Sequence, residues 1–456
     1  MNAWVFGLTY HAARYASPVF CDEDQMNVQI KNTVPAVSNI VVCFHRLKYN
    51  ERMKRRQAFK FELMPNGAQM RDMRRFAGAC RFVYNKALAH QNESYKTDNA
   101  IRFSYSRLAN LLPAWKEDKA TQWLKDSPSQ TLQQALKNLE SGFKNFFAKR
   151  ADFPRFKKKG VSDSFRFPQG FKLEQANSRV YLPKLGWMRY RQSQKVVGEI
   201  KNMTVSCKNG KWFVSIQTER EVEIPKPASV SAVGIDVGIA RFATLSNGEY
   251  IAPLNSFKNR QARLAFVQRD ITRKVKFSCN WVKAKKRISK IHTQISNARR
   301  DFLHKSTTHI SKNHAMVCIE DLQVRNMSRS AKGTMESRGR NVRAKSGLNR
   351  SILDQGWFEF RRQLEYKLDW KGGIFVAVNP RNTSRTCPCC RHAAAENRQT
   401  QAQFACVECG YVNNADVVGA MNVLAAGHAV LACGERVQSD RSMKQEPAEA
   451  SQAAFA

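Results

Sequence analysis

Four cysteines in the C-terminal part of the sequence have the spacing of a metal-binding site. CPCC at 387–390 and CVEC at 406–409 each contain a C-x2-C pair, and 15 residues separate the pairs. Two such pairs close short turns around one tetrahedral ion, the pattern of a zinc ribbon. A redox C-x-x-C is the weaker alternative, because no thioredoxin-like context accompanies the pairs. We predict a structural Zn²⁺ site with Cys389 as a spare thiol and four ligands, Cys387, Cys390, Cys406 and Cys409.

Two acidic residues stand where aliphatic residues would pack better. Asp236 ends the strand-like run SAVGID, and Glu320 ends the apolar run HAMVCIE. If these strands are neighbours, the carboxylates project together, and like charges repel unless a cation lies between them. A Lys or Arg side chain of the protein is one candidate for that cation. Carboxylate oxygens also bind Mg²⁺ or Mn²⁺, and two such ions support phosphodiester cleavage, so the pair predicts a divalent-metal site.

Asp416 is the candidate for a third acid in this cluster. It stands in NNADVVGAMNVLAAGH, where Val417, Met421 and Leu424 predict a short helix with Asp416 in its first turn. Each acid taken singly has another explanation, a helix cap or an ion pair, and for Asp416 an ordinary N-cap is the natural one. Together the acids predict one metal-binding catalytic site, formed by Asp236, Glu320 and Asp416.

The charge of the chain indicates a polyanionic partner. Its 456 residues include 76 Lys and Arg against 37 Asp and Glu, a formal net charge of +39. Such an excess is typical of proteins that bind nucleic acid or an anionic membrane surface. No run approaches the roughly 18 apolar residues of a spanning helix, and the N-terminus lacks a secretory leader pattern. We therefore expect a cytoplasmic nucleic-acid-binding protein with no membrane partner.

Two basic segments are the candidates for nucleic-acid contact. FPRFKKK interleaves cations with Phe153 and Phe156, a combination that suits phosphates and bases. Residues 256–300 hold 14 Lys or Arg and one acid, Asp270, and predict a helical hairpin packed on the sheet with a cationic outer face. A solvated basic surface is the alternative in both places. The predicted contacts are Arg155, Lys157, Lys158, Lys159, Lys283, Lys285, Lys286 and Arg287.

Periodicity divides the N-terminal half into a β-rich and a helical part. Residues 1–52 show no sustained period and predict an extension that is disordered or not native. Alternation in 53–67 and 152–228, with a hairpin turn at Asn209-Gly210, predicts a small β-barrel. Stripes of apolar residues at 3 and 4 spacing predict a helical bundle inserted at 68–151. One helix is expected to be capped by Ser127 before Pro128.

The C-terminal half predicts an α/β domain with an insert. Residues 229–383 and 411–430 alternate buried strands with helices, and 384–410 form the predicted zinc ribbon. The Gly, Ser and Arg-rich segment at 331–350 is expected to be a mobile loop, and the tail 431–456 is expected to be disordered. The scattered thiols predict core residues or inert groups; they are Cys21, Cys43, Cys80, Cys207, Cys279, Cys318 and Cys433.

These motifs together resemble the TnpB (OrfB) family of insertion-sequence-encoded RNA-guided DNA endonucleases, which is related to the type V CRISPR effectors. The matching text is GIDVGI, VCIEDLQVRNMS, TSRTCPCC, CVECGY and ADVVGAMNVL, with FPRFKKK and PSQTLQQALKNL nearer the N-terminus. The resemblance covers about residues 53–430 in the family's order. It places the three acids on the family's metal-binding positions and the four cysteines on its zinc ligands.

The resemblance implies a multidomain α+β fold. A wedge β-barrel with an inserted helical bundle would precede a RuvC-type, RNase H-like α/β nuclease domain split by a zinc-ribbon insert. It also implies a guide RNA derived from the transposon end and a double-stranded DNA target chosen by base pairing, with the protein reading a short flanking motif. The expected activity is divalent-metal-dependent hydrolysis of DNA.

The sequence departs from the family pattern at three places. Arg391 replaces a usual Gly in the first zinc knuckle, which predicts a strained turn or an added phosphate contact. Val418 and Gly419 replace an Asn-Ala pair after the last acid, which predicts a weaker metal site. Residues 1–52 have no family counterpart. A nuclease-inactive RNA-guided DNA-binding repressor is therefore the main alternative, followed by a DNA-joining transposase and a zinc-ribbon RNA-binding protein without catalysis.

Overall fold

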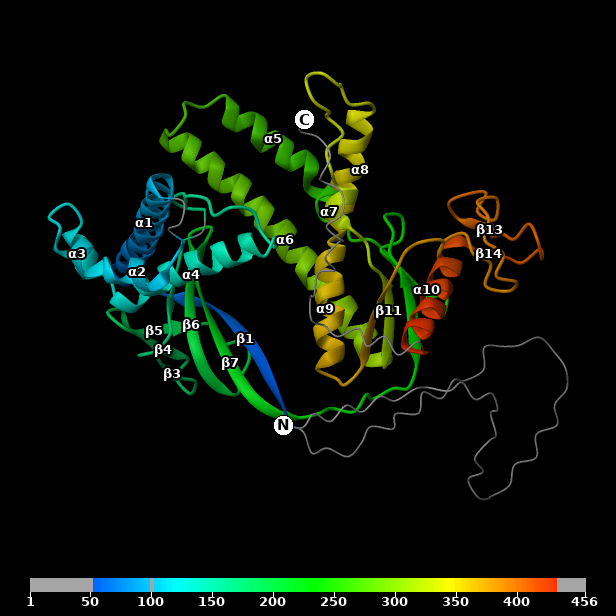
Figure 1. Ribbon diagram of the computed structural model, residues 1–456, viewed down its shortest axis with the longest axis horizontal. Coiled ribbons are helices and arrows are strands. Elements are labelled where there is room, and N and C mark those ends of the chain that lie inside the picture. Colours follow the sequence, from blue (N-terminus) through cyan, green and yellow to red (C-terminus); the bar gives the residue numbers. More distant parts are fainter. Residues whose placement is uncertain (1–51, 99–101, 162, 433–456) are drawn as a thin grey trace, which may run out of the picture. The chain divides into compact units, whose positions relative to one another are not determined.

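The computed structural model describes residues 52–98, 102–161 and 163–432 (Figure 1). All of them belong to one of the two units into which the chain divides, residues 51–456. They contain two large sheets and a two-stranded hairpin. The predictions for the N-terminal extension and for most of the tail lie outside the described residues, as do Cys21, Cys43 and Cys433.

The first sheet is antiparallel and has seven strands in the order β2-β6-β7-β1-β5-β4-β3. Strand β1 joins its two halves, because residues 52–62 pair with β7 and residues 63–64 pair with β5. Asn209 and Gly210, both with positive φ, form the predicted turn between β6 and β7. The strands are β1 (Arg52–Met64), β2 (Ser164–Phe167), β3 (Lys172–Glu174), β4 (Arg179–Leu182), β5 (Gly186–Tyr190), β6 (Glu199–Lys208) and β7 (Lys211–Glu223).

The helices between β1 and β2 share one hydrophobic core with this sheet. Helix α1 begins with a capping box in which Asn66 and Gln69 bond each other's backbone N–H. The predicted cap at Ser127 is wrong: Pro128 takes the N-cap position without a side-chain bond, and Ser127 is buried. The elements are α1 (Gly67–Thr97), α2 (Tyr105–Asn110), α3 (Leu112–Glu117), η1 (Gln122–Asp126) and α4 (Ser129–Phe147).

The second sheet has five strands in the order β10-β9-β8-β11-β12. Strands β8, β9 and β10 form an antiparallel meander, with Asn247-Gly248 between β9 and β10, whereas β11 and β12 run parallel to β8. The first strand in sequence is therefore central. The strands are β8 (Ala232–Asp236), β9 (Ala243–Leu245), β10 (Tyr250–Ile251), β11 (Met316–Glu320) and β12 (Ile374–Val378).

Helices cover both faces of the second sheet. Val233 and Ile235 face a core shared with α6 (Cys279–Asn313) and α9 (Trp357–Asp369). On the opposite face, α10 (Ala415–Ala432) packs on β8, β11 and β12, beside β11 in Figure 1. Gly234 lies under α10, where an added Cβ would be 2.1 Å from the carbonyl oxygen of Ala420. The glycine is required there because the α10 backbone approaches the strand directly.

The basic segment 256–300 forms the predicted helical hairpin, consisting of η2 (Lys258–Arg260), α5 (Gln261–Thr272) and the first part of α6. Its apolar side packs mostly within the hairpin, through Leu264 and Val267 of α5 and Ile291 and Ile295 of α6. The predicted packing of this hairpin on the sheet is therefore wrong, since only the later part of α6, at Leu303 and Ile310, reaches the sheet core.

The expectation of a loop over the whole of 331–350 is wrong. A short helix, α7 (Val324–Met327), precedes the segment, and α8 (Val342–Gln355) occupies its second half. Helix α8, with the sequence VRAKSGLNRSILDQ, has three buried residues, Ile352, Asp354 and Gln355. Most of its arginines and serines are exposed to solvent. Composition suggested a loop because this helix has few core residues.

One helix meets a length and hydropathy criterion for membrane spanning that the sequence analysis did not identify. Helix α10 is long and apolar enough to cross a membrane by length and composition. The helix is the cover of the second sheet, with Val423 fully buried against Met316, Cys318, Val376 and Val378. Its apolar composition is explained by this packing. Among the scattered thiols, Cys80 and Cys318 are buried as predicted, Cys207 is half-buried, and Cys279 is exposed.

Candidate active site and cysteine cluster

Asp236 and Glu320 are the last residues of two neighbouring parallel strands. Ile319 of β11 pairs with Ile235 of β8, so the two residues that follow lie at the same sheet edge. Parallel strands carry their carboxyl ends to one edge, where α/β proteins commonly place their functional groups. The structure therefore brings together the two acids that the strand pattern had selected.

Asp416 joins this edge from the first turn of α10. The side-chain oxygen of Asn414 accepts the backbone N–H of Asp416 at 3.1 Å, so Asn414 takes the capping role and the N-cap explanation for Asp416 does not hold. The Asp416 carboxylate instead lies 3.6 Å from the guanidinium of Arg398. It is thus directed toward other charged groups of the site.

Both other acids act electrostatically on Asp236. Burial raises the pKa of Asp236 to about 7, and the charges of Glu320 and Asp416 add to this effect, while Arg398 opposes it. Burial also raises the pKa of Glu320, against a hydrogen bond from Thr383 and the charge of Arg398. Among the described residues, the oxygens of the three acids do not all lie within 4.8 Å of one another.

Two residues at this edge were missed by sequence reasoning. The hydroxyl of Thr383 donates to Glu320 at 2.6 Å, and its backbone carbonyl accepts from the Asn422 amide at 2.8 Å. Arg398 reaches the acids from the cysteine-rich segment. Thr383 lies in the quoted motif TSRTCPCC and Arg398 lies between the two cysteine pairs, but neither position reveals by itself that the side chain meets an acid.

The segment around Arg398 is fixed by its neighbour Asn397, which is fully buried. The Asn397 amide donates to the carbonyls of Arg385 and His392 at 2.9 and 3.1 Å, and its oxygen accepts the backbone N–H of Val407 at 3.0 Å. Through these hydrogen bonds, Asn397 links residues that flank both cysteine pairs. Arg398 is therefore held by the same framework as the cysteines.

The four predicted cysteines form one cluster. Their sulfur atoms all lie within 4.8 Å of one another, and the pairs Cys387–Cys409 and Cys390–Cys406 are each 3.6 Å apart. A tetrahedral Zn²⁺ at about 2.3 Å from each sulfur requires separations of about 3.8 Å. The donor set therefore fits zinc, and the exposed Cys389 is the spare thiol. Backbone N–H groups, that of Tyr411 first, lower the pKa of Cys409 to about 7.

The two knuckles have matching backbone geometry. Arg391 donates its N–H to the Cys387 carbonyl at 3.0 Å, as Gly410 does to Cys406 at 3.1 Å. Both residues are left-handed, with φ of 66° and 70°. This conformation costs a non-glycine residue about 1 kcal/mol or more. The predicted strain at Arg391 is thus present, and β13 (Gln403–Ala405) and β14 (Val412–Asn414) complete the segment.

The surroundings of Val418 and Gly419 differ from each other, and the weaker metal site expected from these two departures stays a prediction. Val418 is fully buried and packs in a core cluster with Cys387, Phe404 and Cys406, on the cysteine side of α10. The side chain therefore joins the helix to the cysteine cluster. Gly419 is the residue that faces the acids, because an added Cβ would lie 3.0 Å from the carboxylate oxygen Oδ2 of Asp236.

Comparison with known proteins identifies the family. Residues 215–331 match the OrfB_IS605 model, described as "Probable transposase", and residues 357–423 match the Cas12f1-like TNB domain. The chain is 61% identical over 401 residues to the "Putative RNA-guided DNA endonuclease InsQ" of Escherichia coli strain K12, covering 88% of this chain and 100% of InsQ. The chain belongs to the OrfB_IS605 family.

A second relative supports this membership. The "Putative RNA-guided DNA endonuclease" of Streptomyces pristinaespiralis is 35% identical over 407 residues, which cover 86% of this chain and 96% of that protein. Among solved structures, a chain of a Cas12f1-sgRNA-target DNA complex aligns with 81% of this chain and 98% of its own length at 17% identity. The TM-score of 0.29 is too low to support a conclusion about the fold.

Residues 53–100 of this OrfB_IS605 member match a model called a helix-turn-helix domain. The described part of this range forms β1 and one 31-residue helix.

The predicted basic contacts differ in how they face solvent. On α6, Lys283, Lys285, Lys286 and Arg287 are all exposed. In the FPRFKKK segment, Lys158 and Lys159 are exposed, and Arg155 is exposed beside Asp152 at 3.4 Å. Lys157 differs: its ammonium lies 4.1 Å from the centre of the Tyr84 ring, and burial lowers its pKa. Lys157 is therefore not one of the solvent-exposed cations of this OrfB_IS605 protein.

Proposed function

We propose that this chain is an RNA-guided DNA endonuclease that hydrolyses phosphodiester bonds with a divalent metal. The observation that carries the proposal is the convergence of Asp236, Glu320 and Asp416 at one sheet edge. Family membership and the name of InsQ support the same reaction class. The guide is proposed to be RNA from the transposon end, and the target is double-stranded DNA.

The strand order supports a RuvC-type, RNase H-like assignment for the second sheet. Its first strand is central, the next two form an antiparallel meander, and the last two run parallel to the first. The proposed metal acids end the first and fourth strands, and the last helix supplies the third. We further propose that the seven-stranded sheet is the wedge barrel and that the cysteine segment is a zinc-ribbon insert of the nuclease domain.

The donor set is of the kind that Mg²⁺ or Mn²⁺ prefers, since it consists of carboxylates, and burial disfavours the unbalanced charges of Asp236 and Glu320. Bound ions supply water activation and stabilise the leaving oxygen. Asp236, Glu320 and Asp416 would hold the ions, and the charges of both other acids act on Asp236. Thr383 orients the Glu320 carboxylate, and Arg398 offers a cation that balances the acids or contacts a scissile phosphate.

Substitution of the acids tests the proposal. Asp236→Ala or Glu320→Ala should lower DNA cleavage in Mg²⁺ by at least about 100-fold while binding of guide RNA is retained. Asp321→Asn is the matched control, because Asp321 follows Glu320 in sequence but pairs with Arg361 outside the acid cluster. Cleavage by Asp236→Ala at the rate of the control would remove Asp236 from the site.

The repressor alternative makes a different prediction for the unchanged chain. It requires target binding without cleavage, whereas all three acids of the proposed metal site are present in this chain. A cleavage assay with co-expressed transposon-end RNA and a randomised flanking library distinguishes the two. Cut products favour the endonuclease, and bound but intact DNA at saturating Mg²⁺ and Mn²⁺ favours the repressor.

A further inference from the structure

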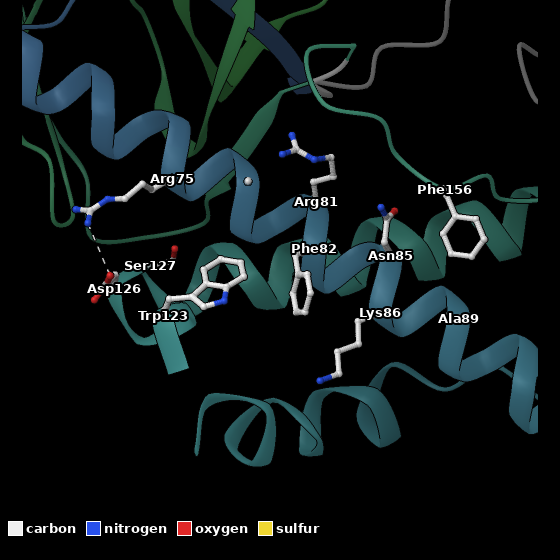
Figure 2. A pocket seen from close by; sticks show the side chains of 11 residues that line it. Arg75, Arg81, Phe82, Asn85, Lys86, Ala89, Trp123, Asp126, Ser127 and Phe156 are labelled. Atoms are coloured by element: carbon white, nitrogen blue, oxygen red, sulfur yellow. Dashed lines mark ion pairs between the residues drawn. The ribbon is translucent and has the colours of Figure 1, made fainter. Parts of the chain in front are cut away.

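A concave feature lies on one face of α1, far from the acids in sequence. A cavity of about 810 Å³ lies over this face between η1 and the loop that holds Phe156; we call it the α1 groove (Figure 2). Its α1 residues recur at spacings of 3 and 4, so they form a single stripe along the helix. The volume is typical of sites that hold small organic groups.

Aromatic rings are presented to solvent at both ends of the α1 groove. Trp123 of η1 is 44% exposed and Phe156 is 54% exposed. Phe82 stands beside Trp123 in Figure 2. The two ring centres are 5.3 Å apart, and the ring planes are inclined at 64°. An edge-on contact of this kind leaves part of the indole ring free for a planar ligand.

Cations outnumber acids in the groove lining. Arg75 lies 3.7 Å from Asp126, and Arg81 is paired with Asp163 at 2.7 Å. Lys86 differs from both: its ammonium lies near the rings of Phe82 and Trp115, and in the described part of the chain no carboxylate is within 4.0 Å of it. Lys86 is therefore the lining cation best placed to pair with a ligand anion.

The groove is held open by contacts that do not depend on a ligand. The Asn85 side chain donates to the Lys157 carbonyl at 3.0 Å and accepts the Lys157 N–H at 2.8 Å. The Lys157 ammonium over the Tyr84 ring anchors the same loop. Both anchors belong to α1, so α1 fixes the position of the neighbouring Phe156 relative to the groove. This explains the inward orientation of a lysine within a basic motif.

We propose that the α1 groove binds an unpaired segment of nucleic acid, with bases stacked on Trp123 and Phe156 and a phosphate at Lys86. Exposed rings with an unpaired cation between them match the chemistry of single-strand binding, in which every base offers a flat face. A duplex hides those faces by stacking and pairing. The proposal deepens the proposed function, because an RNA-guided nuclease handles both a guide RNA and a displaced DNA strand.

Direct binding tests the groove without requiring cleavage. The full chain is titrated, in EDTA, with a fluorescent 12-nucleotide unstructured RNA, with the DNA strand of the same sequence, and with the matching duplex. Trp123→Ala and Phe156→Ala should each weaken single-strand binding by about 5- to 100-fold. Duplex binding should change less than twofold. The RNA and DNA arms show which strand the groove prefers.

Matched variants make the result specific. Trp187→Ala is the control, since Trp187 of β5 is 45% exposed and lies outside the groove lining. Trp123→Phe should restore most of the affinity, and melting temperatures should show that the variants fold. Lys86→Gln should reduce the salt dependence of single-strand binding by about one phosphate contact.

Two outcomes would overturn the proposal. Single-strand affinity of Trp123→Ala equal to that of Trp187→Ala would show that the groove does not hold bases. An equal loss of duplex and single-strand binding would show a general effect on charge or folding. In either case wild-type binding still supports the proposed function, whereas failure of the wild type to bind any of the three probes contradicts the proposed function as well.

Discussion

At the scale of single residues, the ionised form of Asp236 is disfavoured in the folded protein. Burial, Glu320 and Asp416 together raise the pKa of Asp236 to about 7 from an ordinary value of 3.8. A carboxyl group whose pKa is raised on folding opposes folding wherever it is ionised. Its cost is absent below about pH 3.8, grows as the pH rises, and is complete above about pH 7.

Asp236→Asn should therefore stabilise the metal-free protein at alkaline pH. We expect an increase of about 2 kcal/mol at pH 8, or a few degrees in melting temperature, and a smaller increase at pH 5. Thermal unfolding in EDTA at the two pH values measures the effect, with Asp321→Asn as the control. An equal gain at both pH values would contradict a titration effect, and added Mg²⁺ should reduce the gain at pH 8.

We propose Thr383 as a positioning residue for Glu320, which is one of the proposed metal ligands. Thr383→Val keeps the shape of the side chain but removes the hydroxyl that donates to the Glu320 carboxylate at 2.6 Å. Loss of a hydrogen bond to a metal ligand typically lowers metal affinity or activity by about 10- to 100-fold. The Mg²⁺ concentration for half-maximal cleavage should rise in Thr383→Val and return in Thr383→Ser. A lowered rate with an unchanged Mg²⁺ requirement would argue for a merely structural role.

At the scale of elements, the site depends on how closely α10 approaches the second sheet. Gly234→Ala would place a Cβ 2.1 Å from the Ala420 carbonyl oxygen and 2.6 Å from the Leu424 nitrogen, both backbone atoms of α10. The helix must move away, at a cost of about 3 kcal/mol. Asp416, carried by α10, moves with it. We expect a lower melting temperature and reduced cleavage together.

Gly347→Ala is the matched control for this substitution. Gly347 lies within α8, and an added Cβ there meets nothing within 4 Å. Alanine in a helix is favoured over glycine by about 1 kcal/mol, so stability should be unchanged or slightly increased. Retained stability and activity in Gly234→Ala would contradict the close seating of α10.

The elements also show what the sequence could predict. The Asn209-Gly210 and Asn247-Gly248 hairpins and the C-x2-C pairs were predictable because each depends on a few neighbouring residues. Asp236 and Glu320 were predictable because an acid at the end of an apolar strand is unusual. Arg398 and Thr383 were not, because their importance arises from contacts with residues distant in sequence. Helix α8 was missed because its short buried stripe lies among residues typical of loops.

At the scale of the whole molecule, the net charge of +39 means that there are too few acidic residues to pair with each Lys and Arg. Local ion pairs balance some of the basic residues, such as Lys305 with Asp301 at 2.8 Å. The exposed group on α6, Lys283 to Arg287, has no such pairing in the described part of the chain. Unpaired exposed cations release counter-ions when phosphates replace them, so the α6 group should contribute strongly to nucleic-acid affinity at low salt.

Replacing the four cations of the α6 group by Ala should change the salt dependence of binding. Each phosphate contact contributes about 0.7 to 0.9 to the slope of log affinity against log salt, so loss of four contacts lowers the slope by about 3. The control variant removes four exposed lysines that already have acidic partners within 3.1 Å, namely Lys125, Lys144, Lys201 and Lys305. Its slope should fall by less than about 1. Equal slopes in the two variants, measured by titration with DNA duplex from 50 to about 200 mM salt, would mean that total charge alone governs binding and that the α6 group has no special contact with the partner.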